Sequence, residues 1–147
     1  MQEHRKNLIG LKVSHVWRGH GSAIFIEFGD LKKSTRRDGT SANPSGQFTL
    51  MIEWSWRIEK SRSICVGSFS SETKWQTVFN KLLTAEVLDV DCFGTIPEIV
   101  IKLSNGFRVL SFMTEKGQPS WALLSRDPTL GTLCVKRGIL YIEHGNS

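Results

Sequence analysis

Side chains that could do acid–base or metal chemistry are few in this chain of 147 residues. Asp89 and Asp91 flank Val90, so their side chains point to one face of a predicted strand. Glu98 follows across a turn. Carboxylates grouped in this way are hard oxygen ligands for a cation, but an exposed polar strand face explains the same pattern. We favour the second interpretation and predict no metal site and no cofactor.

The three cysteines favour packing over chemistry. Their odd number and the lack of a close pair argue against a disulfide framework. Cys65 and Cys134 lie between aliphatic or β-branched neighbours, which predicts reduced, buried core residues. Nucleophilic catalysis also needs a base and a group that orients it, and no local signature such as G-x-S-x-G is present. The sequence therefore predicts no catalytic residue and no enzyme.

The histidines and glycines give no stronger signal. His15 and His20 lack the Cys or His companions that a zinc site requires, while His4 and His144 lie in ends predicted to be flexible. The segment RGHGS at 18–22 contains Gly-x-Gly. Phosphate-binding loops need a strand before and a helix after, whereas a predicted strand follows here. The sequence predicts a hairpin turn at this point.

Positive charge is concentrated in one polar segment, residues 31–46. It has four cationic side chains in six residues, namely Lys32, Lys33, Arg36 and Arg37. Its Gly, Ser, Thr and Pro content predicts a mobile loop, and such long loops are usually functional or disordered. Residues 1–62 carry 11 Lys/Arg against 6 Asp/Glu, whereas residues 63–147 carry 8 against 8. This asymmetry indicates an anionic partner.

Two interpretations of the basic loop stay open. Nucleic-acid binding would use its cations as phosphate contacts and would stack bases on Trp17, Trp54 or Trp56. In the other interpretation the loop is a solvated segment whose charges protect an edge strand from aggregation. The motifs of known nucleic-acid modules are missing, which favours the second interpretation.

A second cationic group lies in the segment WSWRIEKSRSICVG, residues 54–67. If 47–58 is one strand, Trp54, Trp56 and Ile58 share its core face. The residues left exposed are Arg57, Lys60 and Arg62, which we expect to form a cationic rim near the basic loop.

The elements that must position these residues recur along the chain. Residues 8–16, LIGLKVSHV, match residues 82–90, LLTAEVLDV, at a constant offset of 74. AIFIEFGDL from Ala23 then matches EIVIKLSNG from Glu98 with one inserted residue, and both alternate in the period of a half-buried strand. Later segments share Ser-Trp at Trp56 and Trp121, and ICV against LCV. This recurrence predicts an internal duplication of residues 8–67 and 82–136.

Local patterns predict the elements of each copy. Strands are expected at about 11–18, 22–29, 47–58, 62–67, 85–92, 97–104, 107–114, 120–125, 132–136 and 139–143. Asn105-Gly106 predicts a type I′ hairpin turn. The segment 70–82 begins with serine caps and places Trp75, Val78, Phe79 and Leu82 on one helical face. We predict an α+β fold, predominantly β, with two tandem antiparallel β-units related by a pseudo-twofold and one connecting amphipathic helix.

Size and composition bound the remaining expectations. A chain of this length predicts a single domain, 1–147, with a real core. Its hydrophobic content of 39% is that of a globular protein, and no run approaches a membrane span. With no apolar signal region after the first residues, we expect a cytoplasmic protein that does not enter a membrane. The sequence does not indicate an oligomeric state.

The second half also suggests a family. The pattern Leu82-x-x-x-x-Val87-x-x-Val90, then Ile99-x-Ile101-x-Leu103-Ser104-Asn105-Gly106, then Phe112 and Ser120-Trp121, resembles small, largely uncharacterised bacterial domains. Some of these occur beside polymorphic toxins and are thought to act as immunity proteins. The resemblance implies a non-enzymatic protein that binds another protein, and it carries over no functional residue. The net charge of +5 departs from the acidic character of many nuclease inhibitors.

The sequence thus predicts a binding protein that engages a protein partner through the cationic and aromatic surface of its first half. A nucleic-acid-binding module that uses the basic loop is the alternative.

Overall fold

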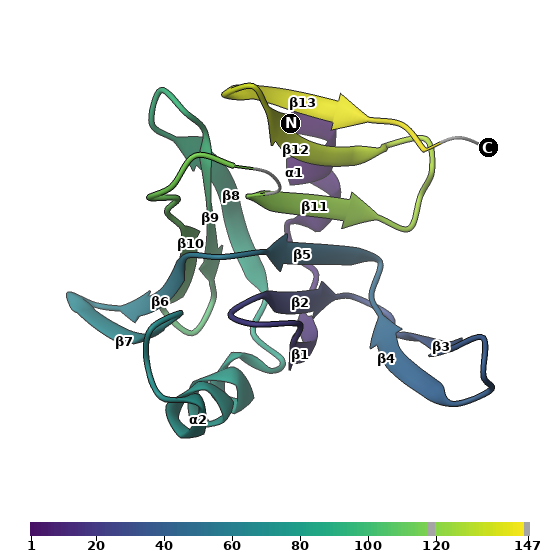
Figure 1. The fold of residues 1–147 in the computed structure, drawn as a ribbon, viewed down its shortest axis with the longest axis horizontal. Helices are drawn as coiled ribbons and strands as arrows, with labels where there is room; N and C mark the ends of the chain where they lie inside the picture. Colours follow the sequence, from purple (N-terminus) through teal and green to yellow (C-terminus); the bar gives the residue numbers. More distant parts are fainter. Residues whose placement is uncertain (118–119, 146–147) are drawn as a thin grey trace.

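The computed structural model describes residues 1–117 and 120–145. Figure 1 shows helices α1 (Gln2–Leu8) and α2 (Glu72–Leu82) and thirteen strands in these ranges. The first half contributes β1 (Val13–Arg18), β2 (Ile24–Phe28), β3 (Lys32–Thr35), β4 (Ser41–Ser45), β5 (Phe48–Ile52), β6 (Trp56–Lys60) and β7 (Ser63–Gly67). The second contributes β8 (Val87–Phe93), β9 (Glu98–Leu103), β10 (Phe107–Ser111), β11 (Trp121–Ser125), β12 (Thr132–Lys136) and β13 (Ile139–Glu143). The predicted α+β class with β predominating is confirmed.

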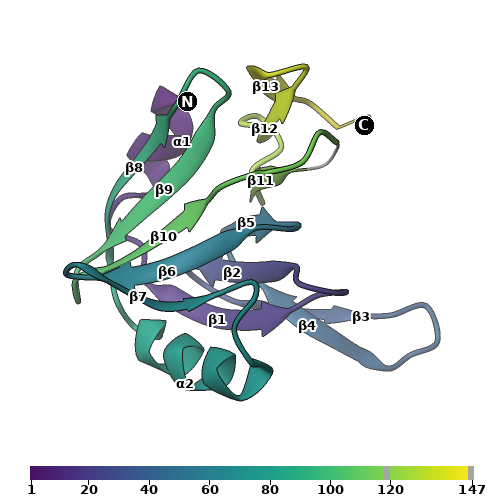
Figure 2. The same cartoon turned by 60° about the vertical axis from the view of Figure 1, so that its left-hand side comes forward.

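The strands form two antiparallel sheets and one separate hairpin. The six-stranded sheet has the order β1-β2-β5-β11-β12-β13, and the five-stranded sheet has the order β7-β6-β10-β9-β8. The strands of the two sheets run in crossed directions in Figure 1. The third pair, β3 and β4, projects from the body of the molecule in Figures 1 and 2.

Each half of the chain is divided between the two sheets. Strands β1, β2 and β5 join β11 to β13 through the β5–β11 pair, and β8 to β10 join β6 and β7 through the β6–β10 pair. Neither predicted repeat therefore forms a sheet of its own. The predicted strand 47–58 is two strands, because Glu53–Ser55 carries the chain from one sheet to the other. The internal duplication itself stays a prediction.

Reciprocal hydrogen bonds join the two halves where β1 and β8 begin. The Val13 amide donates to the Ala85 carbonyl at 2.8 Å, and the Val87 amide donates to the Leu11 carbonyl at 2.9 Å. A second pair links Thr84 N to Val13 O at 2.8 Å and Gly10 N to Val87 O at 2.9 Å. In each pair the two donor residues are 74 positions apart, and so are the two acceptor residues, which is the offset that relates the sequence segments. A local twofold arrangement would produce this reciprocity.

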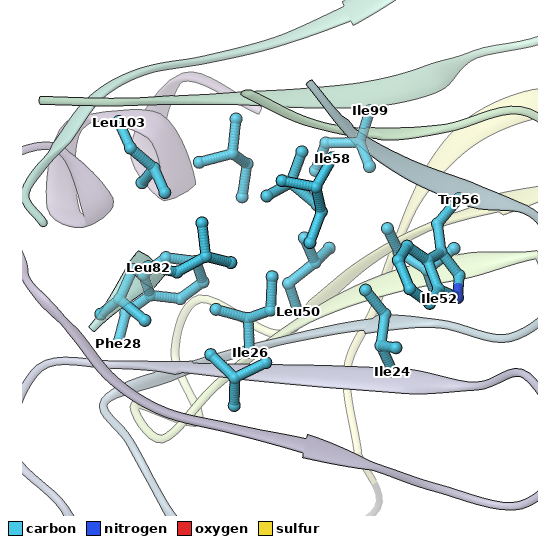
Figure 3. Packing of buried hydrophobic residues seen from close by; sticks show 14 of the residues in the cluster. Ile24, Ile26, Phe28, Leu50, Ile52, Trp56, Ile58, Leu82, Ile99 and Leu103 are labelled. Carbon is cyan, nitrogen blue, oxygen red and sulfur yellow. The ribbon is translucent and has the colours of Figure 1, made fainter. Parts of the chain in front are cut away.

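The inward faces of the two sheets share one core, shown in Figure 3. Ile24, Ile26 and Leu50 of the six-stranded sheet face Ile58 and Ile99 of the other. Fully removing such aliphatic side chains from water contributes roughly 1.5–3 kcal/mol each, so this layer dominates the stability of the fold.

The prediction that Trp56 and Trp121 are buried is confirmed, with exposures of 0% and 1%. Each indole also finds an acceptor just before a strand. Trp56 Nε1 donates to Ser22 O at 2.6 Å, and Trp121 Nε1 donates to Pro97 O at 3.0 Å. A buried indole needs such a partner, so each tryptophan ties the end of one sheet to a turn of the other.

The helix predicted at 70–82 is confirmed as α2. Its Trp75, Val78, Phe79 and Leu82 are all buried, as the spacing indicated. Ser71 occupies the N-cap position without making a side-chain capping bond. The N-terminal helix α1 was not predicted, and the expectation that His4 is flexible is wrong. His4 is buried, with Nε2 2.9 Å from the Gly131 carbonyl oxygen and its ring edge-on to Phe48. Seven residues are too few to show a helical period clearly.

Two predicted hairpins are confirmed, with one correction. The RGHGS segment turns between β1 and β2, which pair antiparallel. The Asn105-Gly106 turn joins β9 and β10. It is not a type I′ turn, because Gly106 has φ +89° but Asn105 is not in the positive-φ region. Neither helix in the described ranges is long and apolar enough to cross a membrane.

Candidate functional site

The outer face of the six-stranded sheet carries a row of apolar and aromatic side chains. Since Ile24, Ile26, Leu50 and Ile52 point into the core, the residues between them point outward. The strand register places one such residue from each strand side by side: Trp17, Phe25, Met51, Ala122, Cys134 and Tyr141. We call these six residues the apolar row. Both helices lie on the core side, α1 against β8 and α2 against β1 and β7, so neither covers it.

An aromatic stack begins the apolar row. The Trp17 and Phe25 rings lie parallel, with centroids 4.0 Å apart and planes 10° apart. Trp17 Nε1 donates to Glu27 Oε2 at 2.8 Å, which fixes the indole. The stack is therefore held in place before any partner arrives, so binding there would cost little side-chain entropy.

A buried carboxylate supports this end of the sheet. Glu27 is 1% exposed and faces no cation among the described residues, but it accepts three hydrogen bonds. Besides Trp17, the donors are the Gly46 amide at 3.0 Å and the Thr49 hydroxyl. Burying a charged group without partners is costly, so these donors make the site stable. Glu27 links the apolar row to the base of the β3–β4 hairpin.

The predicted mobile loop 31–46 contains this hairpin, which we call the basic arm (residues 32–45). Its base is fixed by Arg126, whose Nη2 donates to the Asp30 and Ser45 carbonyls, both at 2.7 Å. On its side, Asn43 Oδ1 lies 3.0 Å from His15 Nε2 on β1. At the tip, the Thr40 amide and hydroxyl donate to Asp38 Oδ1 and lower the pKa of that carboxyl. The arm is thus a structured projection beside the apolar row.

The four predicted cations of the basic arm are all exposed. Arg36 folds back and donates from Nη1 to the Ser41 carbonyl at 2.7 Å. Within residues 1–117 and 120–145, Lys32, Lys33 and Arg37 form no ion pair. Their charges are available to an anionic partner.

The second predicted group does not lie near the basic arm. Arg57, Lys60 and Arg62 belong to the β6–β7 hairpin, which lies at the opposite end of the molecule from the arm in Figures 1 and 2. The expected common cationic surface is therefore wrong. The strands that carry the two groups belong to separate sheets, which adjacent sequence could not reveal.

Two members of this second group already have partners. Arg57 Nε donates to Glu59 Oε2 at 3.1 Å and its guanidinium lies 5.8 Å from the Phe112 ring centroid. The Lys60 ammonium lies 4.9 Å from the centroid of the Phe107 ring. Arg62 is exposed. Trp54, expected in the core beside Trp56, is only half-buried in the connection between β5 and β6.

The outer face of the five-stranded sheet is charged. The register aligns Glu59, Arg108, Lys102 and Asp89, which we call the charged row. Glu59 accepts from Arg108 Nε at 2.8 Å, and Asp89 accepts from Arg5 Nε at 2.8 Å. The hydrogen bond from Arg5 lowers the pKa of Asp89. Both carboxylates of the charged row are thus paired with arginines.

The carboxylates considered for metal binding are engaged separately. Asp89 meets Arg5, whereas Glu98 accepts from the Ser111 hydroxyl at 2.9 Å and from the Met113 amide. Asp91 is exposed and accepts from the Cys92 amide. In the part of the chain that the structure describes, no three His, Cys, Asp or Glu side chains are arranged to hold a metal ion.

The cysteines are free, but the prediction that Cys65 and Cys134 are fully buried is wrong, since both are half-buried. Cys65 lies on the edge strand β7, and Cys134 points outward from β12 as part of the apolar row. Burial raises the pKa of the Cys92 thiol to about 11, with Asp91 adding to the shift, and burial also raises the pKa of Cys134. A thiol with a raised pKa is a poor nucleophile at neutral pH.

A shallow depression of about 450 Å³ lies at the base of the basic arm, lined among others by Asn7, Gln47, Arg126 and Asp127. Two of its charged side chains already have partners in the fold. Arg126 holds the arm, and Asp127 accepts from the Thr129 amide and hydroxyl, which lowers the pKa of Asp127. Arg126 and Asp127 in the depression are therefore engaged in holding the fold.

Known proteins give no guide to the role of these surfaces. No protein-family model matches this chain, and no curated protein or solved structure was found to match it. The resemblance to immunity-like bacterial domains stays a prediction.

Proposed function

We propose that this chain is a non-enzymatic binding protein that engages another protein through the apolar row, with the basic arm contacting acidic groups at the rim of the partner. The observation that carries the proposal is the apolar row, which neither helix covers. Tyr141 is exposed, four members of the row are half-buried, and Ala122 is buried. In a two-sheet fold the outward residues are ordinarily polar, because they face water. A continuous apolar band that crosses a whole sheet is typical of an interaction surface.

The charge beside the apolar row supports an acidic partner. Lys32, Lys33 and Arg37 stand on a hairpin held in place by Arg126, and they form no ion pair in the described ranges. Complementary charge at the rim of an interface speeds association and selects the partner more than it adds affinity. The apolar row would supply the affinity, and the basic arm would supply the selection.

The experiment is affinity capture from the native lysate at low and moderate salt, with the wild type and two matched variants. Leu124→Lys places a charge next to the apolar row at a site that is 39% exposed. Leu88→Lys, on the other sheet at 56% exposure, is the control. An acidic protein retained by the wild type and the control but lost by Leu124→Lys supports the proposal. No retained protein, or equal retention by all three, contradicts it.

Nucleic-acid binding is the second candidate, because the basic arm lies close to the Trp17–Phe25 stack. Trp56 cannot stack on a base, since it is fully buried. Binding of random DNA or RNA would weaken steeply with salt, and the slope of log affinity against log salt would fall by about three or four when Lys32, Lys33, Arg36 and Arg37 are neutralised. A flat salt response removes this candidate.

A further inference from the structure

The last strand, β13, ends the six-stranded sheet with an apolar edge. It pairs with β12 over five residues without a break, and within the described ranges no strand pairs with its other side. Ile139, Tyr141 and Ile142 are 68%, 47% and 38% exposed. Natural edge strands are usually shortened, bulged, charged or covered, because a regular open edge recruits other strands. β13 is regular within the described ranges, and its one charged residue, Glu143, lies at its end.

The other sheet edges are protected. The start of β1 is tied to the start of β8 by the Val13–Ala85 hydrogen bond, and α1 packs against β8. The pairing of β7 with β6 shifts register after Ile58. The contrast makes β13 the edge at which the chain can add a strand.

The residues of β13 are complementary to themselves in one antiparallel register. With Leu140 opposite Leu140 of a second copy, Ile139 faces Tyr141, and Ile142 and Glu143 lie opposite the turn formed by Arg137 and Gly138. Each contact occurs twice across the twofold axis, as in any isologous interface. Cross-strand pairs of an aromatic with a β-branched residue are favourable. A register centred on Tyr141 instead sets Ile139 against Glu143.

We propose that two copies of this chain associate through antiparallel pairing of β13 with β13, centred on Leu140. The two six-stranded sheets then become one sheet of twelve strands. Tyr141 ends the apolar row, so Ile139 of the second copy continues it across the axis. The association does not depend on the proposed partner, since it uses the edge of the sheet and not the middle of its face.

The contacts between Ile139 and Tyr141 set the register. Glu143 accepts from Lys136 Nζ of its own copy at 3.1 Å, and this exposed ion pair contributes little to affinity.

The first measurement is the mass in solution by light scattering or sedimentation over a range of concentrations. We expect the wild type to be a dimer and Ile139→Lys to be at least tenfold weaker in association, because each copy would set a lysine against Tyr141 of the other. Ile64→Lys is the matched control, since Ile64 is 62% exposed on the edge strand β7. A monomeric wild type, or equal loss with Ile64→Lys, overturns the proposal.

The second measurement tests the register. Directly opposed residues in an antiparallel pair have Cα atoms about 4.5–5.5 Å apart, within the range for a disulfide. Leu140→Cys should therefore form a covalent dimer on mild oxidation, whereas Ile139→Cys alone and the wild type should not. Cross-linking of Ile139→Cys without that of Leu140→Cys overturns the proposed pairing. Loss of partner capture in Leu124→Lys with the dimer intact would leave this inference standing.

Discussion

The outer faces of the two sheets differ although the sheets share one core. On the six-stranded sheet the apolar row is partly exposed, whereas in the charged row of the five-stranded sheet Glu59 pairs with Arg108 and Asp89 pairs with Arg5 of α1. The core determines only the inward residues of each strand. The outward residues are free to vary, so the face that departs from a polar composition is the one that points to function.

Matched positions show the same division. Ile24, Ile26 and Phe28 align with Ile99, Ile101 and Leu103, and all six are buried. The intervening Phe25 and Glu27 align with Val100 and Lys102. Trp17 aligns with Asp91 at the offset of 74. Between the two aligned segments, the residues that face the core stay apolar, whereas the outward residues differ.

The largest effect should come from the tryptophans that both sheets need. Trp121→Ala and Trp56→Ala should each lower the free energy of unfolding by about 3–5 kcal/mol, because each removes a buried aromatic and leaves a cavity. Arg57→Ala, on the outer face, should stay within about 0.5 kcal/mol. Denaturant unfolding measures all three. If both tryptophan variants lost only a small amount of unfolding free energy, the two sheets would not share one core as described.

The next largest difference in stability should be between variants of two carboxylates, Glu27 of the six-stranded sheet and Glu59 of the five-stranded sheet. Glu27→Gln turns an amide N–H₂ group toward donors that have no other acceptor, so we expect a loss of about 2 kcal/mol. Glu59→Gln breaks partly solvated pairs with Arg57 and Arg108, so its loss should be below about 1 kcal/mol. Denaturant unfolding of the two variants compares them directly. A greater loss for Glu59→Gln would reverse our description of the two faces.

The rigidity of the basic arm can be compared in two arginine variants, one at the base of the arm and one in the charged row. Arg126→Ala removes both hydrogen bonds from Nη2 to the base of the arm, so cleavage by trypsin after its four cations should quicken. Arg108→Ala, which removes an arginine from the charged row, should not change cleavage in the arm. Peptide mapping of a digestion time course gives both rates. Rapid cleavage of the arm in the wild type would mean that its base is not held by Arg126.

The smallest effect concerns the charged row. The hydrogen bond from Arg5 lowers the pKa of folded Asp89, so its contribution to stability is present above the unfolded pKa and is lost as pH falls through the folded pKa. The small difference in unfolding free energy between the wild type and Asp89→Asn at pH 7 should therefore vanish in strong acid. Unfolding curves from pH 7 to pH 2 follow it. A difference that grows in acid would contradict the ion pair.

Local periodicity was enough to predict most strands, the helix α2 and the burial of Trp56 and Trp121, because alternation and helical spacing report core faces directly. It failed where pairing is long-range. No local signal shows that β5 pairs with β11 and not with β6, so the division of residues 47–58 between two sheets was missed. The short α1 is fixed by distant contacts, such as that between His4 and Gly131.

The candidate site was only partly accessible from the sequence. The four cations of the basic arm were recognised by composition, but the arm's fixed shape depends on Arg126 and His15, which are distant in sequence. The apolar row could not be seen at all. Each of the six strands supplies one residue of the row, and only the pairing register of the strands brings Met51 beside Ala122 and Phe25.

Hydroxyl-radical footprinting of the protein with and without its captured partner tests the role of the apolar row most directly. Trp17, Met51 and Tyr141 carry side chains that react readily with the radical and report the row from its two ends and its middle. We predict that binding slows the oxidation of Trp17 and Met51, while Phe69, 89% exposed and outside the row, keeps its rate. Protection of Phe69 or of residues around the charged row, with Trp17 and Met51 unchanged, would contradict the account.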